Sequence, residues 1–256
     1  MSTSLLNQVE AAATLIQQST YMVVFTGAGI STPSGIPDFR SAESGLWLKD
    51  DPMQVASATA FREHPERFYN WLRPLLEASW KALPNPAHQA IAQLEEKGFV
   101  KAVLTQNIDR LHQKAGSRKV IELHGATSQF HCPMCRSVPQ DSQLIIEEIL
   151  GGSIPHCSRC GGILKPDITL YEEALPEKAW VAACQETSQA DLFLIAGSSL
   201  DVVPAASLPY QAYQHGSRLI IINYSATYLD RYADVVIHQN VAEVLPLITE
   251  KVSNRR

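Results

Sequence analysis

A glycine-rich segment that directly follows an apolar run is the first feature with a chemical meaning. Residues 27–41 read G-A-G-I-S-T-P-S-G-I-P-D-F-R-S and follow Tyr21–Thr26, a run typical of a buried strand. Gly27 and Gly29 carry no side chain, so their amides can turn toward a diphosphate and approach it closely. Mononucleotide folds hold anionic cofactors in this way. Glycine spacing alone leaves nucleotide binding open, because Thr32 stands where the G-x-G-x-x-G pattern has its third glycine.

The continuation of this segment is unusual for a phosphate loop. Pro33 and Pro37 stiffen the backbone, Asp38 and Arg40 add charge, and Phe39 offers a flat apolar face. A loop that only turns a corner needs none of these groups. The segment therefore indicates a binding loop.

A polar string, T-Q-N-I-D-R-L-H, occupies residues 105–112 after another strand-like run. Loops at the carboxyl ends of parallel strands face the ligand. The amides of Gln106 and Asn107 and the carboxylate of Asp109 suit ribose hydroxyls and a carboxamide. The same string could instead form an Asx-type turn that caps the next helix.

His124 lies in the string E-L-H-G at residues 122–125. Imidazole titrates near neutrality, so it can accept a hydroxyl proton at physiological pH. Gly125 leaves one face of the ring open to a cleft. No chemistry is assigned to the histidines in helical stretches or near element ends, which are His64, His88, His215 and His238.

Four of the five cysteines form two C-x2-C pairs, Cys132 with Cys135 and Cys157 with Cys160, separated by 21 residues. Each pair suits one edge of a tetrahedral zinc site. Two disulfides or four free thiols are the alternatives, and a cytoplasmic location argues against disulfides. Four thiolates leave the metal no open position for water, so a structural role is predicted. Cys184, in a helical stretch, is interpreted as a packing residue.

Strands and helices alternate along the chain. A helix is expected over Leu5–Ile16 and another between Asn85-Pro86 and Lys97-Gly98. Strands are expected at residues 21–26, 99–105, 120–123, 168–171, 191–196, 218–223 and 234–237. This alternation predicts an α/β fold with a Rossmann-like, doubly wound, mostly parallel sheet.

Two stretches interrupt the alternation and are expected to form a small lobe. Residues 42–84 are predicted to be a helical insertion, and residues 129–162 hold the two cysteine pairs and are predicted to be a four-cysteine zinc ribbon. The Rossmann-like domain then comprises residues 1–41, 85–128 and 163–256. The expected ligand site is the cleft between the two lobes.

Composition limits the class of protein. The chain has 256 residues, 45% of them hydrophobic, and a net charge of −5. Without a basic tract, direct nucleic-acid binding is not expected. No apolar run is long enough for a membrane span, and the first residues do not resemble a signal peptide. These features predict a soluble, cytoplasmic protein.

Residues 27–41 closely resemble the signature of the sirtuins, the NAD-dependent protein deacylases. The strings at 105–112 and 122–125, the segment G-S-S-L-D-V-V-P-A at 197–205 and the cysteine pairs also resemble that family, as a bacterial-type minimal catalytic core. The resemblance implies NAD as cofactor and a structural Zn²⁺. It also implies that His124 is the general base, that Asn107 and Asp109 hold the nicotinamide, and that Gln106 meets the ribose.

The resemblance implies a larger set of cofactor-binding positions in the loops after the strands. These are Gly27, Ala28, Gly29, Ile30, Ser31, Ile36, Asp38, Phe39, Arg40, Gln106, Asn107, Ile108, Asp109, Gly197, Ser198, Ser199, Asn223, Tyr224, Ser225 and Val241.

Residues 165–173, K-P-D-I-T-L-Y-E-E, resemble the family's K/R-P-x-V-V-F-F-G-E, except that Glu172 replaces the glycine. In the family an acyl-lysine peptide binds as an added strand between this segment and the loop at 202–204. The extra carboxylate leads to the hypothesis that basic residues flanking the acyl-lysine are favoured. The implied substrate positions are Ile168, Leu170, Tyr171, Glu172, Val202, Val203 and Pro204.

The acyl group is expected to be acetyl or another uncharged group. Sirtuins that remove succinyl or malonyl carry Y-x-x-R in the helical insertion, where this chain has Tyr69 followed by Leu72 in the arginine position. Arg73 is one residue further, about 100° around a helix.

The implied reaction is NAD-dependent deacylation of protein lysine. The acyl oxygen attacks the ribose anomeric carbon, nicotinamide leaves, and His124 deprotonates a ribose hydroxyl that captures the acyl carbon. The products are lysine, nicotinamide and O-acetyl-ADP-ribose. Two alternatives remain, a protein mono-ADP-ribosyltransferase that uses the same NAD cleft and a non-catalytic NAD-sensing protein.

Overall fold

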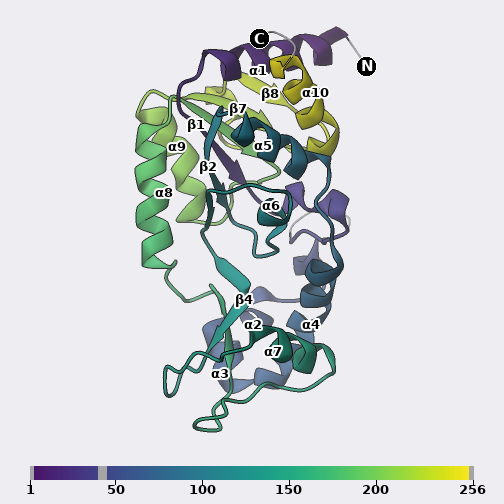
Figure 1. Ribbon diagram of the computed structural model, residues 1–256, viewed down its shortest axis with the longest axis vertical. Coiled ribbons are helices and arrows are strands. Elements are labelled where there is room, and N and C mark those ends of the chain that lie inside the picture. Colours follow the sequence, from purple (N-terminus) through teal and green to yellow (C-terminus); the bar gives the residue numbers. More distant parts are fainter. Residues whose placement is uncertain (1–2, 40–44, 254–256) are drawn as a thin grey trace.

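A six-stranded parallel sheet forms the centre of the larger lobe (Figure 1). The computed structural model describes residues 3–39 and 45–253. The strand order is β3-β2-β1-β6-β7-β8. The strands are β1 (Met22–Thr26), β2 (Val100–Thr105), β3 (Val120–Glu122), β6 (Leu192–Ala196), β7 (Arg218–Ile222) and β8 (Val235–Ile237). The predicted α/β, Rossmann-like fold is confirmed.

The register of the sheet brings the carboxyl ends of the central strands to one edge. Thr26, the last residue of β1, pairs with Thr105 of β2 and with Ala196 of β6. Ala196 pairs in turn with Ile222, the last residue of β7. The loops that begin after these residues therefore lie side by side, as ligand-binding loops do in open α/β sheets.

Helices cover both faces of the sheet (Figure 1). Inward-facing residues of β1 divide between two cores: Val24 belongs to one, and Val23 and Phe25 to the other. Because both faces are buried, the strand is a continuous apolar run rather than an alternating one. One core is covered by α1 (Thr3–Gln18), α5 (Pro86–Glu96) and α10 (Val241–Ser253), and the other by α8 (Glu177–Gln189) and α9 (Leu208–Gln214).

A third core lies in the small lobe, at the bottom of Figure 1. It joins residues from both expected insertions, for example Phe68 and Leu72 with Phe130 and Ile149. Its elements are α2 (Pro52–Val55), α3 (Ala58–Glu63), α4 (Pro65–Lys81), β4 (Gly125–His131), α7 (Ser142–Leu150) and β5 (Lys165–Ile168). The short helix α6 (Leu111–Lys114) connects β2 to β3 in the larger lobe. The exact residue boundaries of the lobes remain a prediction.

The sequence predicted most elements at nearly their observed positions. The second predicted helix is α5, which begins after Asn85, whose side-chain oxygen accepts a hydrogen bond from the Ala87 amide. The strand expected at 168–171 is wrong. The strand there is β5, which ends at Ile168 and pairs antiparallel with β4 in a separate two-stranded sheet. Beyond Ile168 the backbone bonds to other segments, since the Tyr171 amide donates to the Ala56 carbonyl.

None of the helices in residues 3–39 and 45–253 is both long and apolar enough to cross a membrane.

Candidate functional site

The loop after β1 packs tightly against the loop after β6. The Gly29 amide donates to the Gly197 carbonyl at 2.9 Å, and the Gly27 amide to the Ala196 carbonyl at 3.4 Å. A diphosphate-binding role for these two amides stays a prediction. Both are used between loops, because the glycine loop coils into a short 3-10 turn, Ala28–Ile30, against the end of β6.

Gly197 is required by two independent constraints. Its φ is +63°, in the left-handed region that side chains rarely adopt. A Cβ at this position would lie 2.2 Å from the Ile30 amide nitrogen. The contact between the two loops therefore depends on glycine, and it sets the shape of the edge at which a cofactor would bind.

Asn107 and Asp109 are joined through Ser31. The Asn107 side-chain amide donates to the Gly27 carbonyl and to the Ser31 hydroxyl, both at 3.1 Å. Ser31 in turn donates to the Asp109 carboxylate at 2.6 Å. Burial raises the pKa of Asp109, although hydrogen bonds from Ser31 and the Leu111 amide oppose that effect. The structure thus joins predicted residues from the loops after β1 and β2 in one partly buried network.

Buried threonine hydroxyl groups at the ends of β1 and β2 hydrogen-bond to one another and to the backbone of this network. The sequence did not indicate them. Thr26 donates to Thr105 at 2.8 Å, and Thr105 accepts the Asn107 backbone amide at 3.1 Å. His112 Nε2 lies 2.9 Å from the Thr26 hydroxyl. Nothing in the sequence beyond the strand-end position of the threonines indicates these contacts.

His124 follows β3 and contacts the loop after β2. Its Nδ1 lies 2.9 Å from the Gln106 carbonyl oxygen. A carbonyl oxygen only accepts, so Nδ1 carries the proton and Nε2 is the basic nitrogen. The Gln106 side chain donates to the Ser198 hydroxyl at 2.8 Å. His124, Gln106 and Ser198 therefore meet at the carboxyl edge of the sheet, as the sequence predicted for the cofactor loops.

The same histidine contacts the predicted substrate segment. The His124 carbonyl accepts the Thr169 amide at 2.8 Å, and the next residue, Gly125, pairs with Ile168. Gly125 has a φ of +74°, and a Cβ there would lie 1.9 Å from the Asp167 carbonyl oxygen. Glycine at this position is thus needed for the close passage of the substrate segment. His124 thus contacts both the Gln106 loop, where the cofactor is predicted to bind, and the predicted substrate segment.

Aromatic rings connect the predicted cofactor loop with the predicted substrate segment. Phe39 stacks on Trp47 with ring centroids 5.1 Å apart, and Tyr171 meets Trp47 edge-on at 6.2 Å. The Asp38 carbonyl accepts the Leu46 amide at 3.0 Å. Arg40, also expected to bind the cofactor, lies outside the described residues.

The remaining predicted positions lie at the edge of the site or below it. Asn223 is buried and donates from its side chain to the Ser225 carbonyl at 2.8 Å, whereas Tyr224 is 68% exposed. Val241 is the first residue of α10 and is buried in the core that α1, α5 and α10 cover. Ala28 and Ile36 are half-buried in the glycine loop, and Ile108 packs against the small-lobe core. Among the other predicted positions, Leu170 is buried, Val202 is half-buried, and Ser199, Val203 and Pro204 are exposed.

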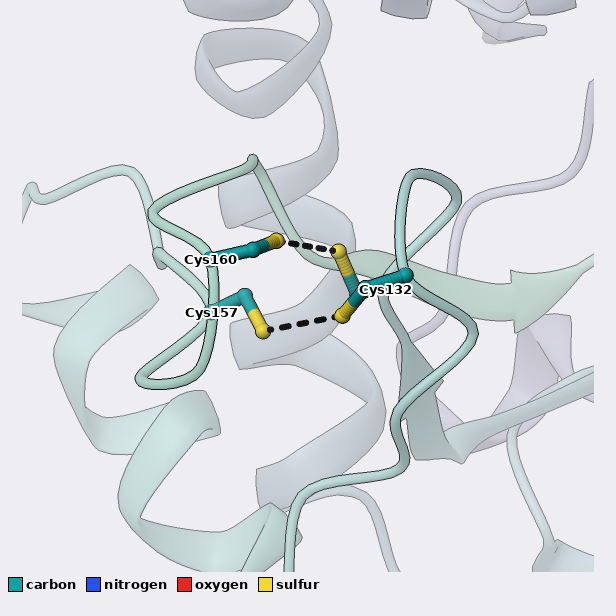
Figure 2. Close-up of side chains that lie close together, drawn as sticks. Cys132, Cys157 and Cys160 are labelled. Carbon is teal, nitrogen blue, oxygen red and sulfur yellow. Dashed lines mark hydrogen bonds between the residues drawn. The ribbon is translucent and has the colours of Figure 1, made fainter.

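The four cysteines converge as the sequence predicted. Their sulfur atoms all lie within 4.8 Å of one another (Figure 2). The thiols of Cys132 and Cys160 are 3.5 Å apart, and those of Cys135 and Cys157 are 3.7 Å apart, so the cysteines are free and the disulfide alternative is wrong. Four sulfurs at this spacing fit a tetrahedral Zn²⁺ with no open position.

Ser137 is a further residue at the thiol cluster. Its hydroxyl lies 3.1 Å from the sulfurs of both Cys135 and Cys157. This hydrogen bonding lowers the pKa of Cys157 to about 6. Hydrogen bonds to the neighbouring thiols act in the opposite direction on Cys160 and raise its pKa.

The fold and the site together define an α/β protein of the Rossmann-like class with a four-cysteine cluster suited to a metal ion. A model of the Sir2 family matches residues 27–204. The NAD-dependent protein deacylase 2 of Archaeoglobus fulgidus is 45% identical, over 98% of this chain and 98% of its own length. The chain belongs to the Sir2 family, the sirtuins.

Solved structures agree with this relationship. One, which concerns the mechanism and regulation of Sir2 enzymes, matches with a TM-score of 0.92 at 45% identity and covers 98% of this chain and 99% of its own. Another is a Sir2 variant with histidine replaced by alanine, in complex with a deacetylated p53 peptide and 3′-O-acetyl ADP-ribose. It matches with a TM-score of 0.87 at 39% identity and covers 93% and 96% of the two chains.

Proposed function

We propose that this protein is an NAD-dependent protein-lysine deacetylase. It converts an acetyl-lysine peptide and NAD to the free lysine, nicotinamide and O-acetyl-ADP-ribose. The observation that carries the proposal is the position of His124. Its ring bonds to the Gln106 carbonyl at the cofactor edge, while its backbone carbonyl accepts the Thr169 amide of the peptide-binding segment.

The chain's residues fit NAD at the sheet edge. The contact between the loops of Gly29 and Gly197 leaves no room for a Cβ, and the amide and carboxylate groups of Asn107 and Asp109 lie beside it. When bound, NAD supplies a ribose whose bond to nicotinamide can break. The matching relative is named for NAD dependence, and a related structure holds an acetylated ADP-ribose.

Each polar group at the edge has a distinct task. His124 accepts the proton of a ribose hydroxyl at Nε2, because Nδ1 is already protonated toward Gln106. Asn107 and Asp109 hold the nicotinamide end of NAD. Ser31 fixes the relative position of the two side chains, because its hydroxyl hydrogen-bonds to both. Gln106 and Ser198 meet the ribose and phosphates. The loop at Asn223 binds the adenosine end.

The acyl-lysine peptide adds as a strand between residues 168–172 and the Val202–Pro204 loop. Its acyl group is uncharged. Leu72 stands where a carboxylate-binding arginine would be needed and is buried in the small-lobe core. Arg73 is directed elsewhere, since its Nε donates to the Ile149 carbonyl of α7 at 2.6 Å.

The zinc ion has a structural role in this proposal. The four cysteine sulfurs would fill all four positions of a tetrahedral ion, which would leave it no open position for the reaction. A cytoplasmic location fits this role, because the reducing cytoplasm keeps cysteine thiols available for a metal.

The test measures the turnover of an acetyl-lysine peptide in the presence of NAD. Turnover is detected as the release of nicotinamide. His124→Ala should lower kcat by at least about 100-fold, the usual contribution of a general base, while NAD binding persists. His215→Ala, an exposed histidine after α9, is the matched control and should behave as wild type. Turnover unaffected by His124→Ala would refute the assigned role. An ADP-ribose adduct on protein in place of O-acetyl-ADP-ribose would support the transferase alternative.

A further inference from the structure

Glu172 has an unusual backbone conformation. Its φ is +74°, in the left-handed region where a side chain is unfavourable. The related signature has glycine at this position, which would adopt the same conformation without strain. A glutamate here calls for a compensating interaction of its side chain.

That interaction is with helix α3 of the small lobe. The Glu172 carboxylate accepts the Thr59 backbone amide at 2.9 Å. Thr59 lies in the first turn of α3, where the Ser57 hydroxyl also accepts the Ala60 amide at 2.9 Å. Hydrogen bonds from Thr59 lower the pKa of Glu172, and the charge of Arg62 acts in the same direction.

Backbone hydrogen bonds join the same two segments. The Ala58 amide donates to the Tyr171 carbonyl, and the Tyr171 amide donates to the Ala56 carbonyl, each at 3.0 Å. With the Glu172 contact, three hydrogen bonds thus connect the start of α3 to residues 171 and 172. Tyr171 also contacts Trp47 edge-on.

The neighbouring residue fixes the segment from the other side. The Glu173 carboxylate accepts the Leu170 amide at 2.9 Å and lies 3.0 Å from the Lys165 ammonium group. Lys165 also donates to the Ile168 carbonyl at 2.8 Å. Glu173 therefore fixes residues 168–171 by contacts within the segment, whereas Glu172 fixes them to helix α3.

We propose that Glu172 is a positioning residue that fixes the peptide-binding segment to helix α3 and thereby sets the affinity for the acyl-lysine peptide. This inference rests on the proposed function. It is separate from the prediction that the Glu172 charge favours basic flanking residues, because it concerns the contact of the carboxylate with Thr59 within the protein.

The main alternative is that Glu172 has no positioning role and that the fold merely tolerates its unfavourable backbone conformation. The two interpretations predict opposite effects for Glu172→Gly. This change removes both the acceptor and the left-handed strain. A tolerated residue predicts unchanged or tighter peptide binding, whereas a positioning residue predicts weaker binding.

The experiment compares wild type with Glu172→Gly and Glu172→Gln, with Glu63→Gln as control. Glu63 is the last residue of the same helix and is exposed. Its substitution removes a similar charge without affecting the hydrogen bond between Glu172 and Thr59. For Glu172→Gly we expect the KM for an acetyl-lysine peptide to rise by about threefold, the effect of losing one hydrogen bond, with kcat and the KM for NAD unchanged. Glu172→Gln keeps an acceptor oxygen and should restore most of the affinity.

Two readouts separate this inference from the proposed function. Hydrogen exchange at the Thr59 and Tyr171 amides should accelerate in Glu172→Gly and remain slow in Glu63→Gln. Peptide affinity measured by fluorescence anisotropy needs no turnover, so it still decides the role of Glu172 if the wild type releases no nicotinamide. Unchanged exchange, or peptide binding as tight as wild type in Glu172→Gly, would overturn the proposal.

Discussion

Two buried histidines should make the stability of this protein strongly dependent on pH. His88 of α5 and His112 of α6 are 0% and 1% exposed, and their rings pack edge to face at 4.9 Å. Burial lowers the pKa of His88 to about 4. Burial, with a smaller effect from His88, lowers the pKa of His112 to about 3. Both rings therefore stay neutral in the folded protein at mildly acidic pH.

The size of the effect follows from proton linkage. Below the ordinary histidine pKa of 6.5, the unfolded chain binds protons that the folded chain excludes, so acid favours unfolding. The stabilisation is present above pH 6.5 and is lost as the pH falls toward the folded pKa values. Lowering the pH from about 7 to about 5 should reduce the free energy of unfolding by about 2 kcal/mol for each histidine.

The assay is urea unfolding of wild type and His88→Leu at several pH values. Comparing the two proteins cancels the contributions of the titrating groups that do not interact with His88, and leaves only the small effect of His88 on His112. Neither His88 nitrogen has a hydrogen-bond partner among the described residues, so the leucine should fold without leaving a polar partner unsatisfied. The variant should lose about 2 kcal/mol less than wild type over this range. An identical pH dependence in both proteins would refute the reasoning.

Three further predictions concern the loop contact, the metal and the buried lysine. Gly197→Ala places a Cβ 2.2 Å from the Ile30 nitrogen and should weaken NAD binding at least about tenfold by calorimetry, because the two loops must separate; equal affinity would contradict the assigned contact. Removal of zinc by a chelator should change the tryptophan fluorescence of the protein, because Trp71 packs against the small-lobe core, and added Zn²⁺ should reverse the change; a spectrum insensitive to chelation would argue against a structural metal. Lys165→Met leaves the partly exposed Glu173 without its 3.0 Å partner and should lower stability by about 2 kcal/mol in thermal or urea unfolding, the contribution of a hydrogen bond to a charged group; unchanged stability would show that the pair contributes nothing.

The sheet and its ligand edge could be predicted from the sequence because they depend on local patterns. Strands buried on both faces must be apolar runs, as in Leu192–Ala196, and parallel pairing then brings the loops after them to one edge. The strings around Asn107 and His124 lie at that edge, where the sequence placed them. The cysteine spacing likewise sufficed to predict the thiol cluster.

Contacts between distant segments could not be predicted in the same way. The pairing of β4 with β5 joins residues on either side of the cysteine lobe, and no local pattern encodes it. The glycines of the first loop suggested phosphate-facing amides, but the requirement at Gly197 depends on how closely Ile30 approaches. The sequence showed that Glu172 replaces a glycine, yet only the structure shows Thr59 opposite its carboxylate.

The most direct test of the account is the product stoichiometry of one reaction. Wild-type protein, an acetyl-lysine peptide and NAD should be quenched at short times and analysed by mass spectrometry. We expect nicotinamide, deacetylated peptide and O-acetyl-ADP-ribose in equal amounts. Free acetate formed without consumption of NAD, or ADP-ribose attached to protein, would contradict the account.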